Sequence, residues 1–286
     1  MDVEVRCGSC ADYAAALATA PFARGWQRDG ELAQRQRWWR PRLRWPGHCR
    51  VCARATMFTT TRQGASATAH GLRLDFRNGQ RCARCRLFAR QRKVVEVLDA
   101  LLQPGSRLYA TEARTRLFAQ CARRYQGRAA AVVGSEYLGA GLAPGALVRG
   151  VRHEDVQRLS FASASFDLLV SCDVLEHVPD FRAALREFAR VLQPGGRLLL
   201  TVPFFGDRDA IVQRAELRAG AVVPLLPPQR HTNPLDRAGS LVFWDFGGDL
   251  LAELRSAGFA TAAAVLYWSE QHGHLGVPSE YFVAER

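Results

Sequence analysis

The chain has 286 residues, which is enough for one large α/β domain and a small module, and its hydrophobic content of 48% is ordinary for a folded protein. No apolar run approaches the roughly 18 residues that a membrane span needs, and the N-terminus lacks the basic-then-apolar order of a signal peptide, so we expect a cytoplasmic protein. The net charge of +12 is uneven: residues 1–95 hold 19 Lys and Arg against 6 Asp and Glu, whereas residues 96–286 hold 20 against 21. This basic region favours an anionic partner such as nucleic acid or a phosphorylated substrate. An arginine-rich coding bias is the alternative, since the chain has a single lysine.

The first segment, residues 1–45, shows no sustained hydrophobic period and is expected to be a basic leader or a lid. It is Ala-rich and then Arg-rich, and its tryptophans are Trp26, Trp38, Trp39 and Trp45. Interleaved Arg and Trp could stack on nucleic-acid bases. Local packing of the same aromatic rings is the alternative.

Two Cys-x-x-Cys pairs indicate a zinc-ribbon-like module over residues 46–90. The pairs are Cys49/Cys52 and Cys82/Cys85. Four thiolates from two such turns give the tetrahedral sulfur set that structural Zn²⁺ prefers. Structural zinc is favoured over free thiols, because a module this small can hardly bury enough apolar surface to fold without a bound metal ion or a disulfide.

The residues between the two pairs, 53–81, form a long connection that must carry structure of its own. Period-2 alternation predicts strands at Thr56–Thr61 and Leu72–Phe76. The two strands would pair with each other between the two Cys-x-x-Cys turns, which we call knuckles. A third pair, Cys7 and Cys10, has no assigned role and could replace one of the other two.

Residues 91–286 alternate helical and strand patterns, which is typical of a parallel α/β sheet. An excursion over residues 204–246 breaks this alternation and suits a substrate cover, with His231, Asn233 and Asp245 as candidate substrate contacts. The predicted helices cover residues 86–102, 114–124, 181–192 and 249–257, and the predicted strands cover residues 107–110, 129–136, 147–151, 166–172, 197–203, 260–268 and 281–284.

The clearest pattern lies between Phe166 and Pro203. An apolar strand ends in Ser-Cys-Asp173, and the run Val-Leu-Glu-His-Val-Pro-Asp180 leads into an amphipathic helix. Gln-Pro-Gly-Gly196 follows the helix and precedes a second apolar strand. The order and turn chemistry predict a strand–helix–strand crossover with parallel strands.

This stretch resembles the fourth and fifth strand motifs of class I S-adenosylmethionine-dependent methyltransferases, and the resemblance extends more weakly from about Arg107 to the C-terminus. It implies an α/β fold with a Rossmann-like seven-stranded methyltransferase sheet over residues 91–286. The implied activity is methyl transfer from S-adenosylmethionine to an oxygen or nitrogen nucleophile of a small molecule. An anionic acceptor would fit the arginine-rich region of the chain.

The first turn of this sheet departs from the family pattern. Where the family has glycines, this chain has Thr111, Ala113 and Thr115, and Tyr109 stands where the family has an acid. Glu112 is the carboxylate left in the turn, and it is expected to contact the cofactor's amino group. Loss of cofactor affinity is the alternative.

Acids after the second and third strands are expected to hold the nucleoside part of the cofactor. A carboxylate at Glu136 can accept hydrogen bonds from both ribose hydroxyls, and the ring of Tyr137 could pack on the adenine. A solvated strand-end carboxylate is the alternative for Glu136. The resemblance implies that Asp155 binds the adenine amino group and that Val156 packs on the ring.

The turn after the fourth strand should complete the pocket with Ser171, Cys172 and Asp173. Imidazole is well suited to accept a proton at neutral pH, so His177 and His231 are the candidate catalytic residues. A positional role for His177, packed under the cofactor, is the alternative.

Two other functions fit the same sequence. One is an RNA methyltransferase in which the zinc-ribbon-like module and its arginines bind phosphates. The other is a zinc-binding protein that keeps the methyltransferase fold without its activity, as the missing glycines would suggest.

Overall fold

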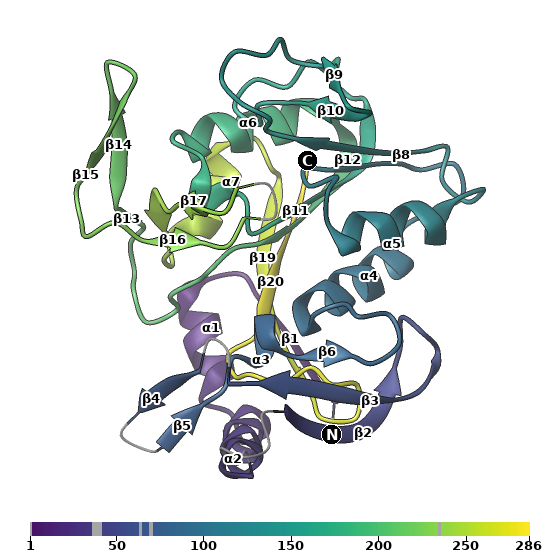
Figure 1. Cartoon of the computed structure of the whole chain (residues 1–286), viewed down its shortest axis with the longest axis vertical. Helices are drawn as coiled ribbons and strands as arrows, with labels where there is room; N and C mark the ends of the chain where they lie inside the picture. Colours follow the sequence, from purple (N-terminus) through teal and green to yellow (C-terminus); the bar gives the residue numbers. More distant parts are fainter. Residues whose placement is uncertain (1, 36–41, 63–64, 69–70, 234–235) are drawn as a thin grey trace. The chain divides into compact units, whose positions relative to one another are not determined.

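A computed structural model describes residues 2–35, 42–62, 65–68, 71–233 and 236–286 (Figure 1). Trp38 and Trp39 lie outside these ranges. The chain forms two compact units: the smaller contains residues 1–7, 11–101 and 265–280, and the larger contains residues 8–10, 102–264 and 281–286. Both predicted domain boundaries, at residues 45 and 90, therefore fall within the smaller unit. Of the helices in the described ranges, none has the length and apolar character required to cross a membrane.

The larger unit is built on a mostly parallel sheet. Its strands follow the order β19-β20-β12-β11-β7-β8-β10-β9, and β20 is antiparallel to β12. Seven of these strands match the predicted Rossmann-like methyltransferase sheet, and β9 is additional. The strands are β7 (Arg107–Ala110), β8 (Ala131–Glu136), β9 (Leu147–Val148), β10 (Val151–His153), β11 (Phe166–Cys172), β12 (Leu192–Thr201), β19 (Thr261–Ser269) and β20 (Glu280–Glu285).

The predicted third strand, residues 147–151, is wrong in one respect. Arg149 and Gly150 adopt positive φ values of 50° and 76°, so the chain turns and β9 pairs antiparallel with β10. Only β10 runs parallel to β8, where His153 lies opposite Glu136. The carboxyl end of this strand therefore comes two residues before Asp155.

The predicted crossover helix is confirmed as α6 (Phe181–Val191). The Asp180 side chain caps it by accepting a 2.9 Å hydrogen bond from the backbone N–H of Ala183. Phe181, Leu185 and Phe188 are fully buried on its inner face. The larger unit also contains α5 (Arg116–Tyr125), the 3₁₀ helix η1 (Leu175–His177) and α7 (Leu250–Ser256).

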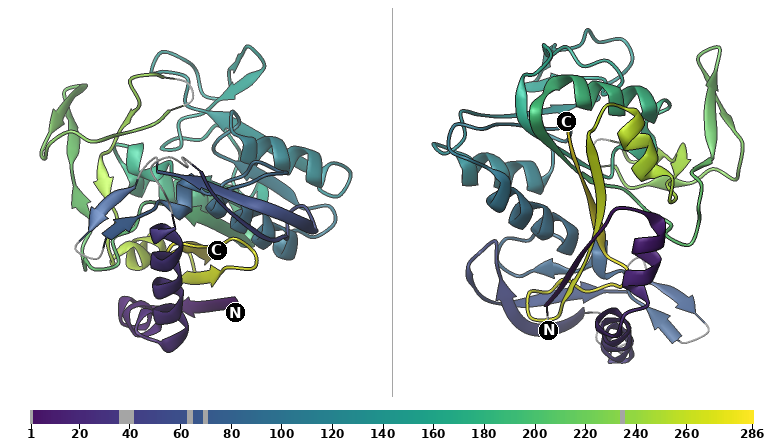
Figure 2. Two further views of the ribbon diagram at one scale, coloured as in Figure 1. Left: turned by 60° about the horizontal axis from the view of Figure 1, so that its bottom comes forward. Right: turned by 180° about the vertical axis from the view of Figure 1, so that it is seen from behind.

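The excursion over residues 204–246 contains more regular structure than expected. Three short antiparallel pairs organise it: β13 with β18, β14 with β15, and β16 with β17. The β14–β15 hairpin extends away from the sheet of this unit (Figure 2). The six strands are β13 (Val212–Gln213), β14 (Ala215–Arg218), β15 (Ala221–Pro224), β16 (Arg230–His231), β17 (Ser240–Leu241) and β18 (Trp244–Asp245).

Regular structure also covers residues 2–35, although the sequence shows no sustained hydrophobic period there. The elements are β1 (Asp2–Cys7), α1 (Cys10–Leu17) and α2 (Ala20–Gln34). Gly25 and Gly30 interrupt the apolar pattern of α2 in the sequence. A Cβ atom at Gly25 would lie 3.1 Å from the Trp268 ring, so the glycine permits close packing there.

The zinc-ribbon-like region is centred on a three-stranded sheet, with β2 (Arg42–Cys49) and β6 (Arg81–Cys82) on either side of β3 (Arg54–Thr61). The predicted pairing of residues 56–61 with 72–76 is wrong, because β3 pairs with β2 and β6. Trp45 is buried against Phe58 and Phe76, so it is not available for base stacking. The remaining elements are β4 (Ser66–Thr68), β5 (Gly71–Arg73), α3 (Phe76–Gly79) and α4 (Ala89–Leu101).

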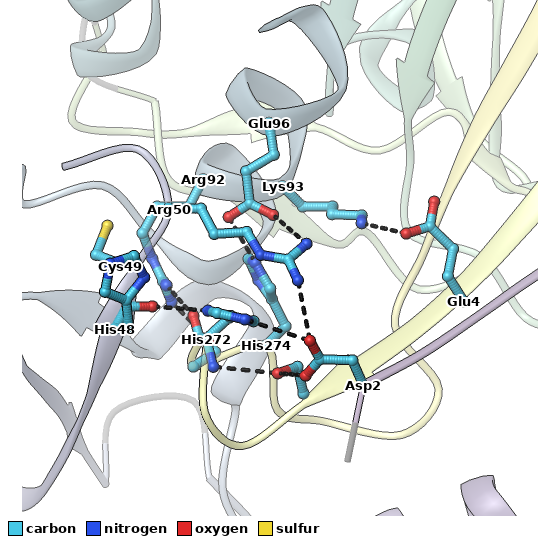
Figure 3. A network of polar contacts seen from close by, with 12 residues as sticks. Asp2, Glu4, His48, Cys49, Arg50, Arg92, Lys93, Glu96, His272 and His274 are labelled. Carbon is cyan, nitrogen blue, oxygen red and sulfur yellow. Dashed lines mark hydrogen bonds and ion pairs between the residues drawn. The ribbon is translucent and has the colours of Figure 1, made fainter. Parts of the chain in front are cut away.

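A polar network on α4 fixes the loop between β19 and β20 (Figure 3). Arg92 donates to the backbone carbonyls of His272 and Gly273 at 2.6 and 2.5 Å. The Nε2 atom of His274 lies 2.8 Å from Glu96 Oε1, and both side chains are almost fully buried. The two loop histidines thus have structural partners within the smaller unit.

The buried His274 side chain predicts acid sensitivity. Burial lowers its pKa from 6.5 to about 4. The unfolded chain therefore binds a proton that the folded chain excludes, and stability falls as the pH drops from 6.5 towards 4. Urea unfolding at pH 7 and pH 5 should show a loss of about 2 kcal/mol from this group. His274→Gln should reduce that loss, whereas the control His48→Gln should retain it; equal losses in all three proteins would contradict the assignment.

Close packing at Gly134 in β8 gives a second prediction. A Cβ atom there would lie 2.5 Å from the nearest ring carbon of Phe118 on α5. Gly134→Ala should lower the free energy of unfolding by about 1–3 kcal/mol through overpacking. In a double-mutant cycle followed by urea unfolding, Phe118→Ala should relieve part of that cost, because it removes the clashing ring. Strictly additive effects would argue against the contact.

Candidate functional site

The carboxyl ends of β7, β8, β10 and β11 define one edge of the larger unit's sheet. These strands are mutually parallel, so the turns that follow them meet at the same edge, where open α/β sheets bind ligands. The predicted cofactor residues occupy these four turns. We call them the rim: Thr111, Glu112, Ala113, Glu136, Tyr137, Asp155, Val156, Ser171, Cys172 and Asp173.

The turn after β7 is held by the protein's own hydrogen bonds. Thr111 Oγ1 donates to Ser171 Oγ at 3.2 Å, and the N–H of Ala113 donates to the Ser135 carbonyl at 2.9 Å. Thr115 caps α5 by accepting from the N–H of Phe118 at 3.1 Å. Threonine at the family's glycine positions is therefore used for local structure. The Glu112 side chain is also in this turn, and the residue is 9% exposed.

Glu136 stands at the end of β8. One carboxylate oxygen accepts a 2.7 Å hydrogen bond from the N–H of Arg114. Burial raises the pKa of the Glu136 carboxyl. Within the described residues the second oxygen has no hydrogen-bond donor, so it can accept from a ligand hydroxyl. Tyr137, which follows it, is 55% exposed and its ring centroid lies 5.5 Å from that of His153.

Asp155 follows β10 in a tight turn. Its carboxylate accepts from the N–H and the side-chain amide of Gln157 at 2.9 and 3.0 Å. Val156 is 9% exposed. His153 is buried, and its Nδ1 accepts from the N–H of Leu138, which ties the β10 end to the β8 end.

Asp173 ends β11 with an unusual backbone. Its φ of 54° lies in the left-handed region, which a residue other than glycine adopts at some cost. The Thr201 hydroxyl donates to its carboxylate at 2.9 Å, and its N–H donates to the Thr201 carbonyl at 2.8 Å. Ser171 and Cys172 are buried just before it. Two bonds to β12 therefore hold the strained turn.

The two candidate catalytic histidines lie together on either side of Glu176. Their ring centroids are 5.1 Å apart at an interplanar angle of 86°. His177 Nε2 and His231 Nδ1 lie 3.6 and 3.5 Å from Glu176 Oε1. The excursion reaches this point because β16 pairs with β17 and the N–H of Phe243 donates to the Glu176 carbonyl. We call Glu176, His177 and His231 the acid–histidine cluster.

The other candidate substrate contacts have structural partners. Asp245 is buried and accepts from Arg208 and Arg214 at 3.2 and 2.8 Å. Asn233 donates to Ser240 Oγ at 2.9 Å across the β16–β17 hairpin.

The four predicted metal ligands come together in the smaller unit. The sulfur atoms of Cys49, Cys52, Cys82 and Cys85 all lie within 4.8 Å of one another. Cys49 Sγ is 4.0 Å from Cys85 Sγ, and Cys52 Sγ is 4.0 Å from Cys82 Sγ. Hydrogen bonding with the Cys49 thiol lowers the pKa of Cys82 and raises that of Cys85.

The two knuckles have matching backbones. Ala53 and Arg86, the residues directly after Cys52 and Cys85, have φ values of 52° and 64°. The third pair takes no part in the cluster. Cys10 Sγ donates to the Gly248 carbonyl at 2.9 Å in the larger unit, whereas Cys7 ends β1 in the smaller one.

Sequence reasoning assigned no role to Glu176. The residue is fully buried, and within the described residues neither of its carboxylate oxygens has a hydrogen-bond donor. The available signal was its position directly before His177 and three residues after Asp173, in the turn that follows a buried strand.

Known proteins resemble part of this chain. The profile of the family described as "Methyltransferase domain" matches residues 93–200. The 27-O-demethylrifamycin SV methyltransferase of Amycolatopsis mediterranei is 33% identical over 91 residues, which is 30% of this chain and 34% of that protein. The ubiquinone biosynthesis O-methyltransferase of Xanthomonas oryzae pv. oryzae is 38% identical over 69 residues, covering 24% and 28%.

The chain also resembles a solved structure, that of the Burkholderia thailandensis 1,6-didemethyltoxoflavin-N1-methyltransferase with bound 1,6-didemethyltoxoflavin and S-adenosylhomocysteine. The alignment covers 68% of this chain and 77% of that chain, with 19% sequence identity and a TM-score of 0.40. The chain thus spans about a third of the length of the curated relatives it matches. The profile match and the sheet order agree over the segment that carries the rim. Residues 93–200 match a methyltransferase domain, and the strand order of the larger unit fits the predicted Rossmann-like methyltransferase sheet.

Proposed function

We propose that the protein transfers a methyl group from S-adenosylmethionine to an oxygen or nitrogen atom of a small molecule. The observation that carries this proposal is the methyltransferase-domain match over residues 93–200 together with the carboxylate of Glu136 at the end of β8. The two curated relatives support a small-molecule acceptor, since one is named for 27-O-demethylrifamycin SV and the other for ubiquinone biosynthesis.

The rim fits the nucleoside part of the cofactor. Glu136 would accept from the ribose hydroxyls through the oxygen that Arg114 leaves available. Asp155 would accept from the adenine amino group, while Val156 and the exposed ring of Tyr137 would cover the base. Glu112 and the Ser171–Asp173 turn would bind the methionine part. The turn after β7 fits less closely, because the N–H groups of Ala113 and Arg114 already donate to the protein.

The bound cofactor supplies a methyl group on a sulfonium; the acceptor lone pair forms the new bond to the methyl carbon, and the electrons of the broken C–S bond stay on sulfur. The protein's contribution is then to align the acceptor and to take up any proton that it loses. Glu176 of the acid–histidine cluster follows Asp173 by three residues, and the side chains of His177 and His231 are 19% and 30% exposed. We assign the acceptor to this cluster.

The four-cysteine cluster is proposed to hold structural Zn²⁺. Four sulfurs at about 2.3 Å from one zinc ion stand roughly 3.8 Å apart. The two 4.0 Å sulfur distances are close to this value. Four thiolates fill a tetrahedral zinc, so the ion would stabilise the module and take no part in methyl transfer. Cysteines arranged for a metal suit a reducing compartment, which supports a cytoplasmic location.

Cofactor binding can be tested at Glu136. Glu136→Gln keeps an oxygen for the N–H of Arg114 but removes the charge from the proposed ribose contact. Titration calorimetry should show S-adenosylmethionine affinity falling about 10- to 100-fold, the cost of losing hydrogen bonds to a charged group. Glu285→Gln is the control, since Glu285 pairs with Arg197 at the far end of β20. Unchanged affinity in Glu136→Gln would remove Glu136 from the cofactor site.

Zinc binding can be tested at Cys52. The purified wild-type chain should contain about one zinc ion, and Cys52→Ser should lose it, because a structural site needs its fourth ligand. Cys121→Ser replaces a buried cysteine of the larger unit and should keep the metal. Elemental analysis by mass spectrometry measures the zinc, and circular dichroism follows the folding of each variant. Zinc retained in Cys52→Ser at the wild-type level would refute the site.

A further inference from the structure

The acid–histidine cluster contains a buried carboxylate that has no hydrogen-bond donor among the described residues. Glu176 has no exposed surface, and no donor among the described residues reaches either carboxylate oxygen. Burying an ionised carboxylate in this way is costly unless a cation or a proton neutralises it. The two imidazole nitrogens that face it stand 3.6 and 3.5 Å away, which is too far for a hydrogen bond.

These separations suit three ligands of one metal ion. Nitrogen and oxygen ligands at about 2.1 Å from a shared ion stand roughly 3.0 to 3.5 Å apart. One ligand atom from each of Glu176, His177 and His231 lies within 4.8 Å of the other two. A divalent cation between them would neutralise the carboxylate and would explain why the three polar groups face one another without hydrogen bonds.

The outer contacts of the cluster favour the same arrangement. His177 Nδ1 lies 2.7 Å from the Leu241 carbonyl, so Nδ1 carries the hydrogen and the lone pair of Nε2 points towards Glu176. Ligating histidines usually donate their other N–H to a carbonyl or carboxylate in this way. The side-chain amide of Gln229 lies 3.3 Å from His231 Nε2. The atom at this distance is the amide nitrogen; rotating the amide by 180° exchanges it with the oxygen, which then accepts from Nε2–H and leaves Nδ1 free to bind the ion.

We propose that Glu176, His177 and His231 bind a divalent transition-metal ion that holds an oxygen acceptor for methylation. Two imidazoles and one carboxylate suit Mn²⁺, Fe²⁺ or Zn²⁺, and three protein ligands leave coordination positions open. A hydroxyl bound at an open position would lose its proton more readily to solvent water; its oxygen lone pair would then form the bond to the methyl carbon, and the electrons of the broken C–S bond would stay on sulfur. The ion site stands on its own geometry, whereas its role in methylation rests on the proposed function.

Binding of Mn²⁺ tests the site directly. The zinc-loaded full-length chain is titrated with Mn²⁺, and the unbound ion is measured by its electron paramagnetic resonance signal. About one Mn²⁺ should bind per chain, since thiolates favour zinc over manganese. Glu176→Gln and His231→Ala should each weaken binding at least tenfold, the loss that even outer contacts of a metal site can cause.

Asp236→Asn is the matched control. It also converts a carboxylate to an amide in the excursion, but Asp236 is exposed and accepts from the N–H of Ala238. Its Mn²⁺ affinity should equal that of the wild type. Thermal melting and retained zinc identify variants that fold. If buried Glu176→Gln does not fold, His231→Ala, on a partly exposed hairpin, still decides the question. No saturable Mn²⁺ binding to the wild type, or wild-type affinity in His231→Ala, overturns the site.

Two further measurements separate this inference from the proposed function. Acetohydroxamate, a small oxygen chelator, should bind the Mn²⁺-loaded chain and change the signal of the bound ion; no binding would overturn the oxygen-acceptor assignment. S-adenosylmethionine affinity is measured without added Mn²⁺. Mn²⁺ binding without cofactor binding supports the ion site and overturns methyl transfer, whereas cofactor binding without Mn²⁺ binding does the reverse.

Discussion

The parallel pairing of β7, β8, β10 and β11 is the constraint on which the candidate site depends. Because their ladders place all four carboxyl ends at one edge, turns that are distant in sequence meet there. Glu136 and His153 lie directly opposite each other in the β8–β10 ladder, and Thr111 reaches Ser171 across the β7–β11 pair. The site therefore follows from backbone hydrogen bonding first, and from the identity of the side chains second.

Strong local signals made the central part of the fold predictable. The Asp180 cap and the spacing of Phe181, Leu185 and Phe188 gave α6 correctly, because capping and periodicity act within a few residues. Pairing over longer distances was less accessible: alternation at residues 56–61 identified β3, but it could not reveal that residues 42–49 and 81–82 are the partners. Helix α2 was not predicted, because glycine has a low helix propensity. Gly25 is present because it permits close packing against Trp268.

The site shows the same division. Cys49, Cys52, Cys82 and Cys85 were identifiable because the Cys-x-x-Cys spacing itself places two sulfurs in one turn. His177 and His231 were both chosen from the sequence, but their proximity depends on the β16–β17 hairpin, 54 positions along the chain, which no local pattern could place. Glu176 was overlooked for a related reason. Its significance comes from burial without hydrogen bonds, and burial is a property of the folded chain.

The smaller unit is discontinuous in sequence, because residues 265–280 return to it after the chain has passed through residues 102–264 of the larger unit. Arg92 on α4 donates to the carbonyls of residues 272 and 273, and Asp29 accepts from the N–H groups of residues 276 and 277. During synthesis, Arg92 and Asp29 therefore cannot form these hydrogen bonds until residues 272–277 have been made. Contacts of such long sequence separation slow folding. If the four-cysteine cluster binds its proposed zinc ion early, the ion would keep the zinc-ribbon-like module compact until residues 265–280 have been synthesised.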